Sequence, residues 1–443
     1  MAAIVRGTDA AAGETRPGGN NEWSRTGPSA EEGHTSAEQR LPAAASEHGS
    51  RATKGATDGG SERHPPLQDP EAAVPIGTVV EVRARNVDEL FYEATVTAYD
   101  AACGTYSVRY RDGTDDAKLL RSSMIVPSQR RMVTENEVML VQDGHVYLDE
   151  RVRQARLLSF KSSPHIYQSA VVFEEQFDAR GGCTLVFDHR AVTFEAYQAS
   201  VMALALLGDR AATAKVCLLG AGAGCVAMGI LEHAPRGHLD VVELDPEILA
   251  VAHDFFGVPR GDDRLRTFVA DGLEFFCPIE HASAYDLVIV DVADPEAPQA
   301  GSESGFEADF CLELPPPEFV EREFLLDKAL ASVKDNGWLV VNVIAGRACL
   351  LKILDDLENW CARVYVLATD PNYLFYVSRD SALTAIPPSV VAAGARQLGL
   401  DKSCGAVFAQ VEHSVQNLAK NVALGWLRAA AFRELLMDPS VMI

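Results

Sequence analysis

Apolar residues along the chain follow two kinds of pattern, and the change between them divides the sequence. From about residue 75 to 190, short runs alternate apolar and polar residues or are rich in β-branched and aromatic residues, which is typical of antiparallel strands. From 191 to 380, continuous apolar runs such as Val216–Leu219 and Tyr285–Val290 alternate with helical patterns. Such runs are typical of a parallel sheet with helices on both faces. The pattern therefore predicts an α/β domain, Rossmann-like over residues 191–380, preceded by all-β segments.

The all-β part divides at a linker around Pro127–Glu137. Residues 75–127 carry four strand-like runs and an Asp112-Gly113 turn signal, which favour a small barrel. Residues 138–190 carry further alternating runs and are predicted to form a β-hairpin region. The barrel runs are Thr78–Arg83, Phe91–Ala98, Tyr106–Tyr110 and Ala117–Ile125.

The two ends of the chain have their own compositions. Residues 1–70 are rich in small, polar and charged residues and have almost no aliphatic residues after Val5. They bury too little apolar surface to offset the entropy of ordering, so we expect a disordered tail. Residues 381–443 are predicted to be a helical extension, with one helix around Val407–Phe432.

The stretch from Lys215 to Asp245 combines a strand, a glycine-rich turn, a helical pattern and a second strand that ends in Glu243. Glycines let the backbone approach a ligand, and the helix that follows offers free N–H groups. An acid at the tip of the second strand accepts hydrogen bonds from ribose hydroxyls. A nucleoside-containing cofactor is therefore expected across these strand ends, although such a turn is in some proteins only a tight connection.

Two further strands of this domain also end in acids. Leu265–Val269 is followed by Asp271, a candidate to accept the amino group of a base, although Asp-Gly pairs are also common in plain turns. Tyr285–Val290 is followed by Asp291 and then Asp294. A carboxylate that leaves the end of a central parallel strand points into the ligand crevice, so these two are the candidate catalytic residues. The full predicted cofactor-binding set is Gly220, Ala221, Gly222, Gly224, Glu243, Leu244, Asp271, Gly272 and Asp291.

Charge and cysteine usage limit the partners. With 63 acidic and 39 basic residues the formal net charge is −24, which repels nucleic acid and anionic membranes and favours cationic partners. The nine cysteines are scattered without metal-ligand spacing, so no metal site is predicted. We expect reduced thiols and a cytoplasmic or nuclear protein. No apolar run reaches the length of a membrane span, and neither a signal peptide nor a transit peptide is expected.

The glycine spacing G-x-G-x-G, with an acid about twenty residues on, resembles S-adenosylmethionine-dependent methyltransferases and their relatives, the aminopropyltransferases. The stretch LPPPEFVEREFL at Leu314–Leu325 is similar to the elongation factor 1-alpha lysine and N-terminal methyltransferase family. The stretch RLLSFKSSPHIYQSAV, before the glycine strand, is similar to a hairpin of both that family and the spermidine synthases. The resemblance implies a seven-stranded methyltransferase sheet and S-adenosyl-L-methionine as cofactor. It also implies a protein substrate methylated on a lysine or N-terminal amine, with Asp291 beside that amine. The family's stretch here is D-V-D, which Asp291 and Val292 match and Ala293 does not, and Asp294 is the second candidate acid.

Two rival functions stay open. The first is an aminopropyltransferase of the spermidine synthase type, because Asp291 and Asp294-Pro295 match the D-x-x-D-P motif of that family. The family also has a Y-Q-E-M motif, of which this chain keeps Tyr197-Gln198 but has Ala199 and Ser200 in place of the acid and the methionine. The loss of that acid disfavours polyamine synthesis. The second rival is a non-catalytic interaction protein with a vestigial cofactor fold. Failure to bind any form of the cofactor would favour this interpretation.

The barrel segment resembles the Tudor and agenet modules, which bind methylated lysine or arginine in an aromatic cage. Tyr92 and Tyr110 stand where cage residues are expected, so a methylated peptide is one predicted partner. Aromatic residues in short strands more often belong to the core, which favours a degenerate interaction barrel over a tight reader.

Overall fold

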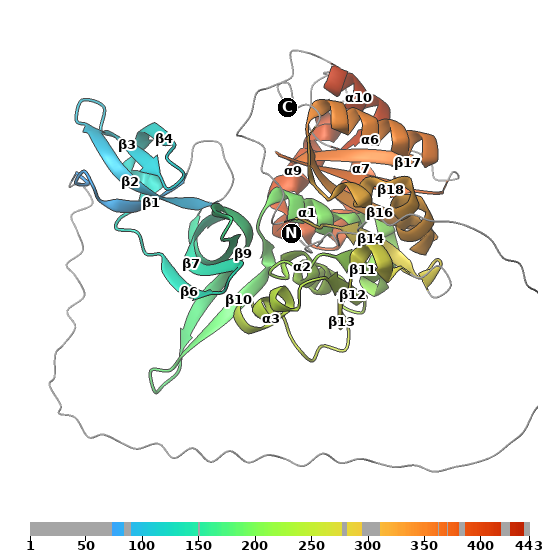
Figure 1. The fold of residues 1–443 in the computed structure, drawn as a ribbon, viewed down its shortest axis with the longest axis horizontal. Coiled ribbons are helices and arrows are strands. Elements are labelled where there is room, and N and C mark those ends of the chain that lie inside the picture. Colours follow the sequence, from blue (N-terminus) through green and yellow to red (C-terminus); the bar gives the residue numbers. More distant parts are fainter. Residues whose placement is uncertain are drawn as a thin grey trace, which may run out of the picture. The chain divides into compact units, whose positions relative to one another are not determined.

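A computed structural model shows the arrangement of the chain (Figure 1). The predicted tail at 1–70 lies outside the described residues, as do residues 295–310. The residues that the structure describes are 73–83, 90–148, 151–276, 281–294, 311–361, 363–369, 371–380, 386–417 and 426–437.

The first all-β region is a five-stranded antiparallel sheet in the order β4-β3-β2-β1-β5. Alternate residues such as Val80, Val82 and Val108 point into its core. The predicted last strand is interrupted: a 3₁₀ turn at Arg121–Ser123 separates β4 from β5, so the run 117–125 is not one strand. The strands are β1 (Val79–Arg83), β2 (Phe91–Asp100), β3 (Thr105–Tyr110), β4 (Asp115–Leu120) and β5 (Met124–Ile125).

The second all-β region is a five-stranded antiparallel meander in the order β10-β9-β8-β7-β6. It begins earlier than predicted, because β6 forms inside the expected linker and pairs with β7. We call β6 to β10 the meander. Its strands are β6 (Arg131–Glu135), β7 (Met139–Leu148), β8 (Arg151–Phe160), β9 (Ser163–Phe177) and β10 (Cys183–Val192).

The α/β domain is built on a nine-stranded sheet, two strands more than predicted. Its main path runs β13-β12-β11-β14-β16-β18-β17-β19, and β15 pairs with β16 at one end. The strands from β13 to β16 are parallel to one another, whereas β18 is antiparallel and inserts between β16 and β17. The strands are β11 (Lys215–Leu219), β12 (His238–Glu243), β13 (Leu265–Val269), β14 (Tyr285–Val290), β15 (Leu312–Leu314), β16 (Val333–Ala345), β17 (Arg363–Thr369), β18 (Asn372–Ser378) and β19 (Trp426–Arg428).

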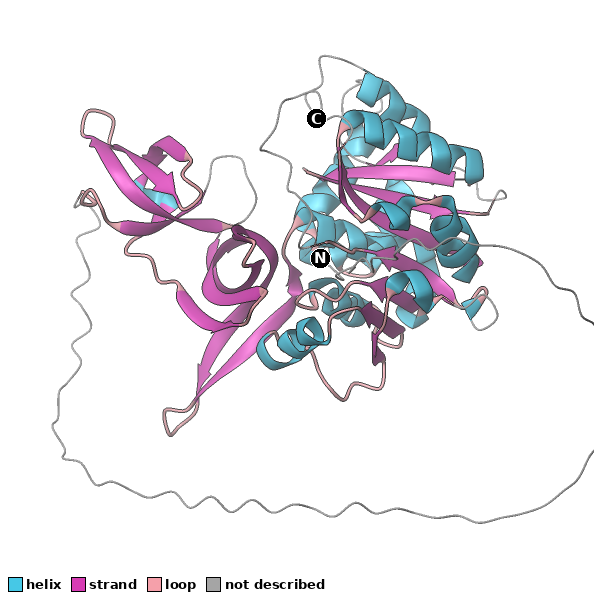
Figure 2. Cartoon of the chain, in the orientation of Figure 1, coloured by secondary structure: helices cyan, strands magenta, loops and turns pink. Residues whose placement is uncertain are grey.

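Helices cover both faces of this sheet (Figure 2). They are α1 (Glu195–Met202), α2 (Cys225–His233), α3 (Pro246–Phe255), α4 (Gly272–Phe275), α6 (Arg347–Trp360), α7 (Pro388–Gln397), α8 (Leu400–Ser403), α9 (Gly405–Asn417) and α10 (Ala429–Met437). Tighter or wider turns form η2 (Ala203–Thr213), η4 (Pro317–Val320) and the π-helical η5 (Glu323–Leu330).

The continuous apolar strands divide their side chains between two cores. Along β11, Val216 and Leu218 join one hydrophobic cluster and Cys217 and Leu219 join the other, because successive side chains of a strand point to opposite faces. Each fully buried side chain of this size contributes about 1.5–3 kcal/mol relative to an exposed one. Burial on both faces is therefore what turns these runs into central strands.

The chain after residue 380 differs from the prediction of one helix around Val407–Phe432. Helix α9 is a separate element from the strand β19 and the helix α10, and residues 418–425 between them lie outside the described part. Strand β19 pairs with β17, so this segment extends the sheet. Helical periodicity alone did not reveal a three-residue edge strand.

Buried polar contacts join the first all-β region, which we call the barrel sheet (β1 to β5), to the meander. Another joins the meander to the α/β domain. Glu81 of β1 is fully buried and bonds His145 of β7, with Arg130 beside it. Burial acts to raise the pKa of the Glu81 carboxyl, but His145 and Arg130 outweigh it and the pKa lies below its ordinary value. Arg156 of β8 donates to the carbonyl of Phe255 (2.8 Å) at the end of α3.

Candidate active site

The glycine-rich turn connects β11 to α2 and needs its glycines for conformation. Gly220, Gly222 and Gly224 have φ values of 94°, 49° and 83°, a region that strains residues with a Cβ. A Cβ at Gly224 would also lie 2.3 Å from Cγ2 of Val258. The turn is anchored by the N–H of Gly220, which donates to the carbonyl of Val242 (2.8 Å).

Glu243 lies beside this turn, at the end of β12. Strands β11 and β12 are parallel neighbours, so the end of β12 lies beside the start of the turn. The Glu243 carboxylate is 0% exposed and accepts from the N–H groups of Ala221 and Asp245, both at 3.0 Å. Burial raises its pKa to about 7 despite these donors. Leu244, which follows it, packs against both cores.

Asp271 lies at the next strand end but has a local partner. Its Oδ1 accepts from the N–H of Leu273 (2.8 Å), so it caps the short helix α4. The N–H of Ala270 donates to the carbonyl of Glu243 (3.0 Å), which holds the two strand ends together. A Cβ on Gly272 would lie 3.3 Å from the ring of Phe319, a residue of the LPPPEFVEREFL stretch. That stretch therefore supports the turn where the base of a nucleoside is predicted.

Asp291 follows β14 at the same edge of the sheet. Its N–H donates to the carbonyl of Leu219 (3.0 Å), which places it beside the start of the glycine-rich turn, and the residue is 2% exposed. Oδ1 accepts from Nδ2 of Asn342 (2.8 Å), whose own Oδ1 accepts from Nδ2 of Asn372 (2.9 Å). Asp294, three residues after Asp291, is partly buried and is the last described residue before the gap at 295–310.

The meander brings polar groups to this edge that the sequence analysis missed. Ser169 of β9 accepts from the N–H of Ala223 in the glycine-rich turn (3.3 Å). The side-chain oxygen of Gln168 is buried without a partner among the described residues. Tyr197 donates to the carbonyl of Gln168, and its pKa is raised well above the ordinary value by burial and by the nearby charge of Asp291. The sequence signal that could have revealed these groups is the polar pair Tyr167-Gln168 ahead of the apolar residues of β9.

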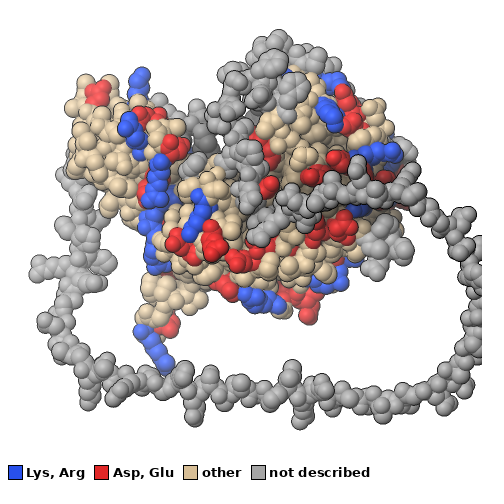
Figure 3. Space-filling model, viewed as in Figure 1, with Lys and Arg blue, Asp and Glu red and all other residues tan. Residues whose placement is uncertain are grey.

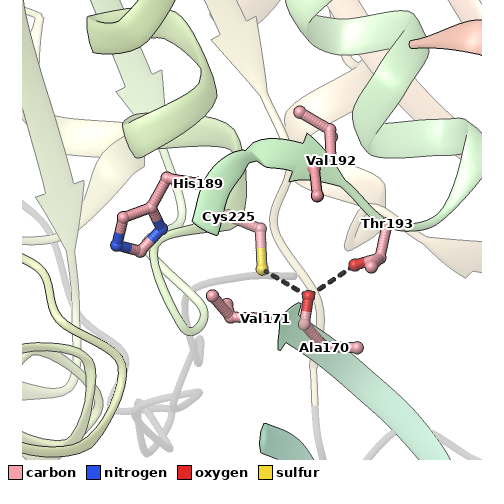
Figure 4. A pocket seen from close by; sticks show the side chains of 7 residues that line it. Ala170, Val171, His189, Val192, Thr193 and Cys225 are labelled. Atoms are coloured by element: carbon pink, nitrogen blue, oxygen red, sulfur yellow. Dashed lines mark hydrogen bonds between the residues drawn. The ribbon is translucent and has the colours of Figure 1, made fainter. Parts of the chain in front are cut away.

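A pocket lies at the seam between β9, β10 and the start of α2 (Figure 4). Its volume is about 10 Å³, close to the smallest that holds one water molecule. Cys225 and Thr193 both donate to the carbonyl of Ala170 at its base. Burial raises the pKa of the Cys225 thiol to about 11, so this thiol is protonated at neutral pH and is a poor nucleophile.

The predicted aromatic cage is only partly assembled within the barrel sheet. The rings of Tyr92 and Tyr110 meet edge to face with centroids 6.4 Å apart. Tyr92 also stacks on Tyr167 of the meander at 5.5 Å, and Arg130 lies 5.0 Å from the Tyr167 ring centroid. Burial and the neighbouring Asp116 raise the pKa of Tyr110 to about 12. One face of the predicted cage therefore takes part in the contact between the two sheets.

The described part of the chain contains no group of His, Cys, Asp and Glu that could hold a metal ion, and its eight cysteines are all free. Among the described helices none has the length and apolarity to cross a membrane. Acidic and basic side chains are mixed over the visible face (Figure 3).

Comparison with known proteins places this site in context. Residues 194–314 match the spermine/spermidine synthase domain family. The eEF1A lysine and N-terminal methyltransferase of Homo sapiens is 30% identical over 158 residues, which are 34% of this chain and 21% of that protein. Spermidine synthase 1 of Hyoscyamus niger is 29% identical over 133 residues, 29% of this chain and 39% of that enzyme.

A solved structure, human methyltransferase-like protein 13 in complex with SAH, is 25% identical with a TM-score of 0.39, covering 46% of this chain and 92% of the solved one. The chain spans only about a fifth of the length of the human methyltransferase that it matches. Over its central part the chain is therefore similar to both predicted groups, the methyltransferases and the spermidine synthases.

Proposed function

We propose that this protein is an S-adenosylmethionine-dependent methyltransferase that methylates an amine of a protein substrate. The observation that carries the proposal is the meeting of three features at one sheet edge: the glycine-rich turn, the buried Glu243 carboxylate on it, and Asp291 beside it. Ligands of open α/β sheets bind at this edge. The matched relatives include methyltransferases by name, which supports the same reaction class here.

The cofactor is S-adenosyl-L-methionine, and the residues present fit it. Gly220, Gly222 and Gly224 bring backbone without side chains to this edge, and α2, which has no side-chain cap, begins directly after the turn. Glu243 is held for the ribose hydroxyls, and Asp271 and Gly272 lie where the base would stack or bond. The oxygen of Gln168, which has no partner among the described residues, offers a further acceptor from the meander.

In this proposal Asp291 binds the acceptor amine, and Asp294 is a second acid near it. An amine is mostly protonated at neutral pH and has no lone pair to attack with, so a carboxylate must first orient it and take its proton. The nitrogen then forms a bond to the sulfonium-activated methyl carbon while the carbon–sulfur bond breaks and leaves its electron pair on sulfur. The protein otherwise acts mainly by holding the partners in line.

The proposed acceptor is a lysine or N-terminal amine of a basic protein, with elongation factor 1-alpha as the first candidate. Support comes from the net charge of −24, which favours a cationic partner, and from the substrate that the matched relatives carry in their names. A cytoplasmic or nuclear location and a methylated-peptide partner for the barrel belong to this proposal. Imaging of a tagged chain and titration with methylated peptides test them.

The second candidate is an aminopropyltransferase that uses decarboxylated S-adenosylmethionine. The family match over residues 194–314 and the Asp291 and Asp294 pair favour it, and Ala199 disfavours it. Calorimetry can compare the affinities for the two cofactors. Tighter binding of the decarboxylated form would overturn the methyltransferase proposal.

The direct test is transfer of a labelled methyl group from S-adenosylmethionine to recombinant elongation factor 1-alpha and to a cell lysate, followed by mass spectrometry. The proposal expects labelled lysine or N-terminal amine. Binding without transfer to any protein amine, or no cofactor binding at all, would instead support the non-catalytic interpretation.

A further inference from the structure

Asp291 is the first member of a row of polar side chains that crosses three neighbouring strands. The row runs from Asp291 after β14 to Asn342 on β16 and Asn372 at the start of β18, through hydrogen bonds of 2.8 and 2.9 Å. Val290 pairs with Val341, so Asp291 and Asn342 follow at equivalent positions on adjacent parallel strands. Because β18 is antiparallel, its first residue lies at the same edge.

Chemistry fixes the direction of this row. An ionised carboxylate only accepts hydrogen bonds, so Asn342 must turn its NH₂ group to Asp291 and its carbonyl oxygen away. That oxygen needs a donor, which Asn372 supplies. Each amide therefore has one orientation, and Asn372 acts on Asp291 only through Asn342.

Packing alone does not account for Asn342. It interrupts the apolar run of β16, whose residues Val340, Val341 and Val343 are buried, and it is itself 2% exposed. A buried amide is costly unless its polar atoms are bonded, and an apolar residue would fit a central strand better. The side chain that makes this position favourable is the carboxylate of Asp291.

We propose that Asn342, oriented by Asn372, is a positioning residue that holds the Asp291 carboxylate aimed at the acceptor amine. This inference rests on the proposed function, because it assigns Asp291 to the amine. An uncharged donor suits that role, because it fixes the carboxylate without neutralising the charge that the amine must meet. A lysine or arginine at position 342 would compete with the substrate cation.

The test is a double-mutant cycle between Asn342→Leu and Asp291→Asn, with labelled-methyl transfer to recombinant elongation factor 1-alpha as the readout. Asn342→Leu is expected to lower kcat roughly tenfold while KM for the acceptor and Kd for S-adenosylhomocysteine stay within about twofold. In the Asp291→Asn background the same change is expected to have no further effect, because residues that act as a unit are not additive. Asn372→Ala is expected to lower kcat by about threefold.

Ser378→Ala is the matched control, since Ser378 is a buried polar residue at the opposite end of β18. Equal losses in both backgrounds, a change confined to KM, or the same loss in the control would overturn the inference. If Asn342→Leu does not fold, Asn372→Ala in the same cycle decides, because that residue is only partly buried. A wild-type protein that binds cofactor and labels nothing would instead contradict the proposed function, and the inference would fall with it.

Discussion

The two edges of the central sheet hold buried carboxylates on the same strands but satisfy them differently. At the amino end of β12, Asp240 accepts two bonds from Arg266, at 2.7 and 2.6 Å, and one from the hydroxyl of Tyr285. At the amino end of β14, Asp286 meets Arg210 and Lys334, each at 2.8 Å. These acids are neutralised by cations of the chain itself.

At the carboxyl edge, backbone and side-chain amide groups donate to the acids. Within the described part of the chain, Glu243 accepts from backbone N–H groups, and Asp291 accepts from the amide of Asn342. Neutral donors orient a carboxylate but leave its charge to interact with a ligand. The ion pairs of the first edge stabilise the fold, whereas the proposed function assigns the acids of the second edge to the cofactor and the amine.

The sharpest test of this comparison is Asp291→Asn. We expect kcat for methyl transfer to fall roughly 10²- to 10⁴-fold, the range of general acid–base contributions, because the amide cannot take the proton of the amine. The melting temperature and the affinity for S-adenosylhomocysteine should change little. A variant that keeps more than half of the wild-type kcat would contradict the assignment.

Glu243→Gln should mainly affect cofactor binding. Replacing the carboxylate weakens the charge-assisted bonds expected from the ribose hydroxyls, each worth about 1.5–3 kcal/mol, so the Kd for S-adenosylmethionine should rise roughly 10- to 100-fold. Calorimetry measures it. Asp240→Asn, on the same strand, is the control that should leave the Kd unchanged.

Glu243 also predicts a pH dependence. Its pKa in the folded protein is about 7, above the ordinary value, so the stability that it contributes is full below about pH 4.5 and is lost as pH rises through 7. Ribose hydroxyls favour the ionised form, so cofactor affinity should fall by up to about tenfold per pH unit below pH 7, with proton release on binding. Calorimetry in buffers of different ionisation enthalpy should detect the proton, and its absence in wild type would refute the coupling.

Asp286→Asn should give the smallest effect, and that effect should be on stability, with none on catalysis or cofactor binding. Burial acts to raise the pKa of Asp286, but Lys334, the N–H of Lys215 and Arg210 outweigh it, so the pKa is lowered and the ionised acid stabilises the fold. Because Arg210 and Lys334 are partly exposed, the loss should be about 1–2 kcal/mol. Urea unfolding measures it, while cofactor affinity stays at the wild-type value.

The sequence by itself determined the parts that depend on local order along the chain. Apolar runs of strand length predicted β11, β12, β13 and β14. The acids at the ends of the last three, Glu243, Asp271 and Asp291, lie at the carboxyl edge because parallel strands present their ends together. The glycine spacing likewise predicted a turn whose φ values now exclude other residues at three positions.

Only the tertiary structure decided which strands are neighbours. The insertion of β18 beside β16 brings Asn372 to Asn342, and the meander carries Gln168 and Ser169 to the glycine-rich turn; no local pattern encodes either contact. The capping role of Asp271 and the added strands β15 and β19 were missed for a related reason. Hydrophobic periodicity records which face of an element is buried, but the partner that buries it is chosen by the packing of the whole chain.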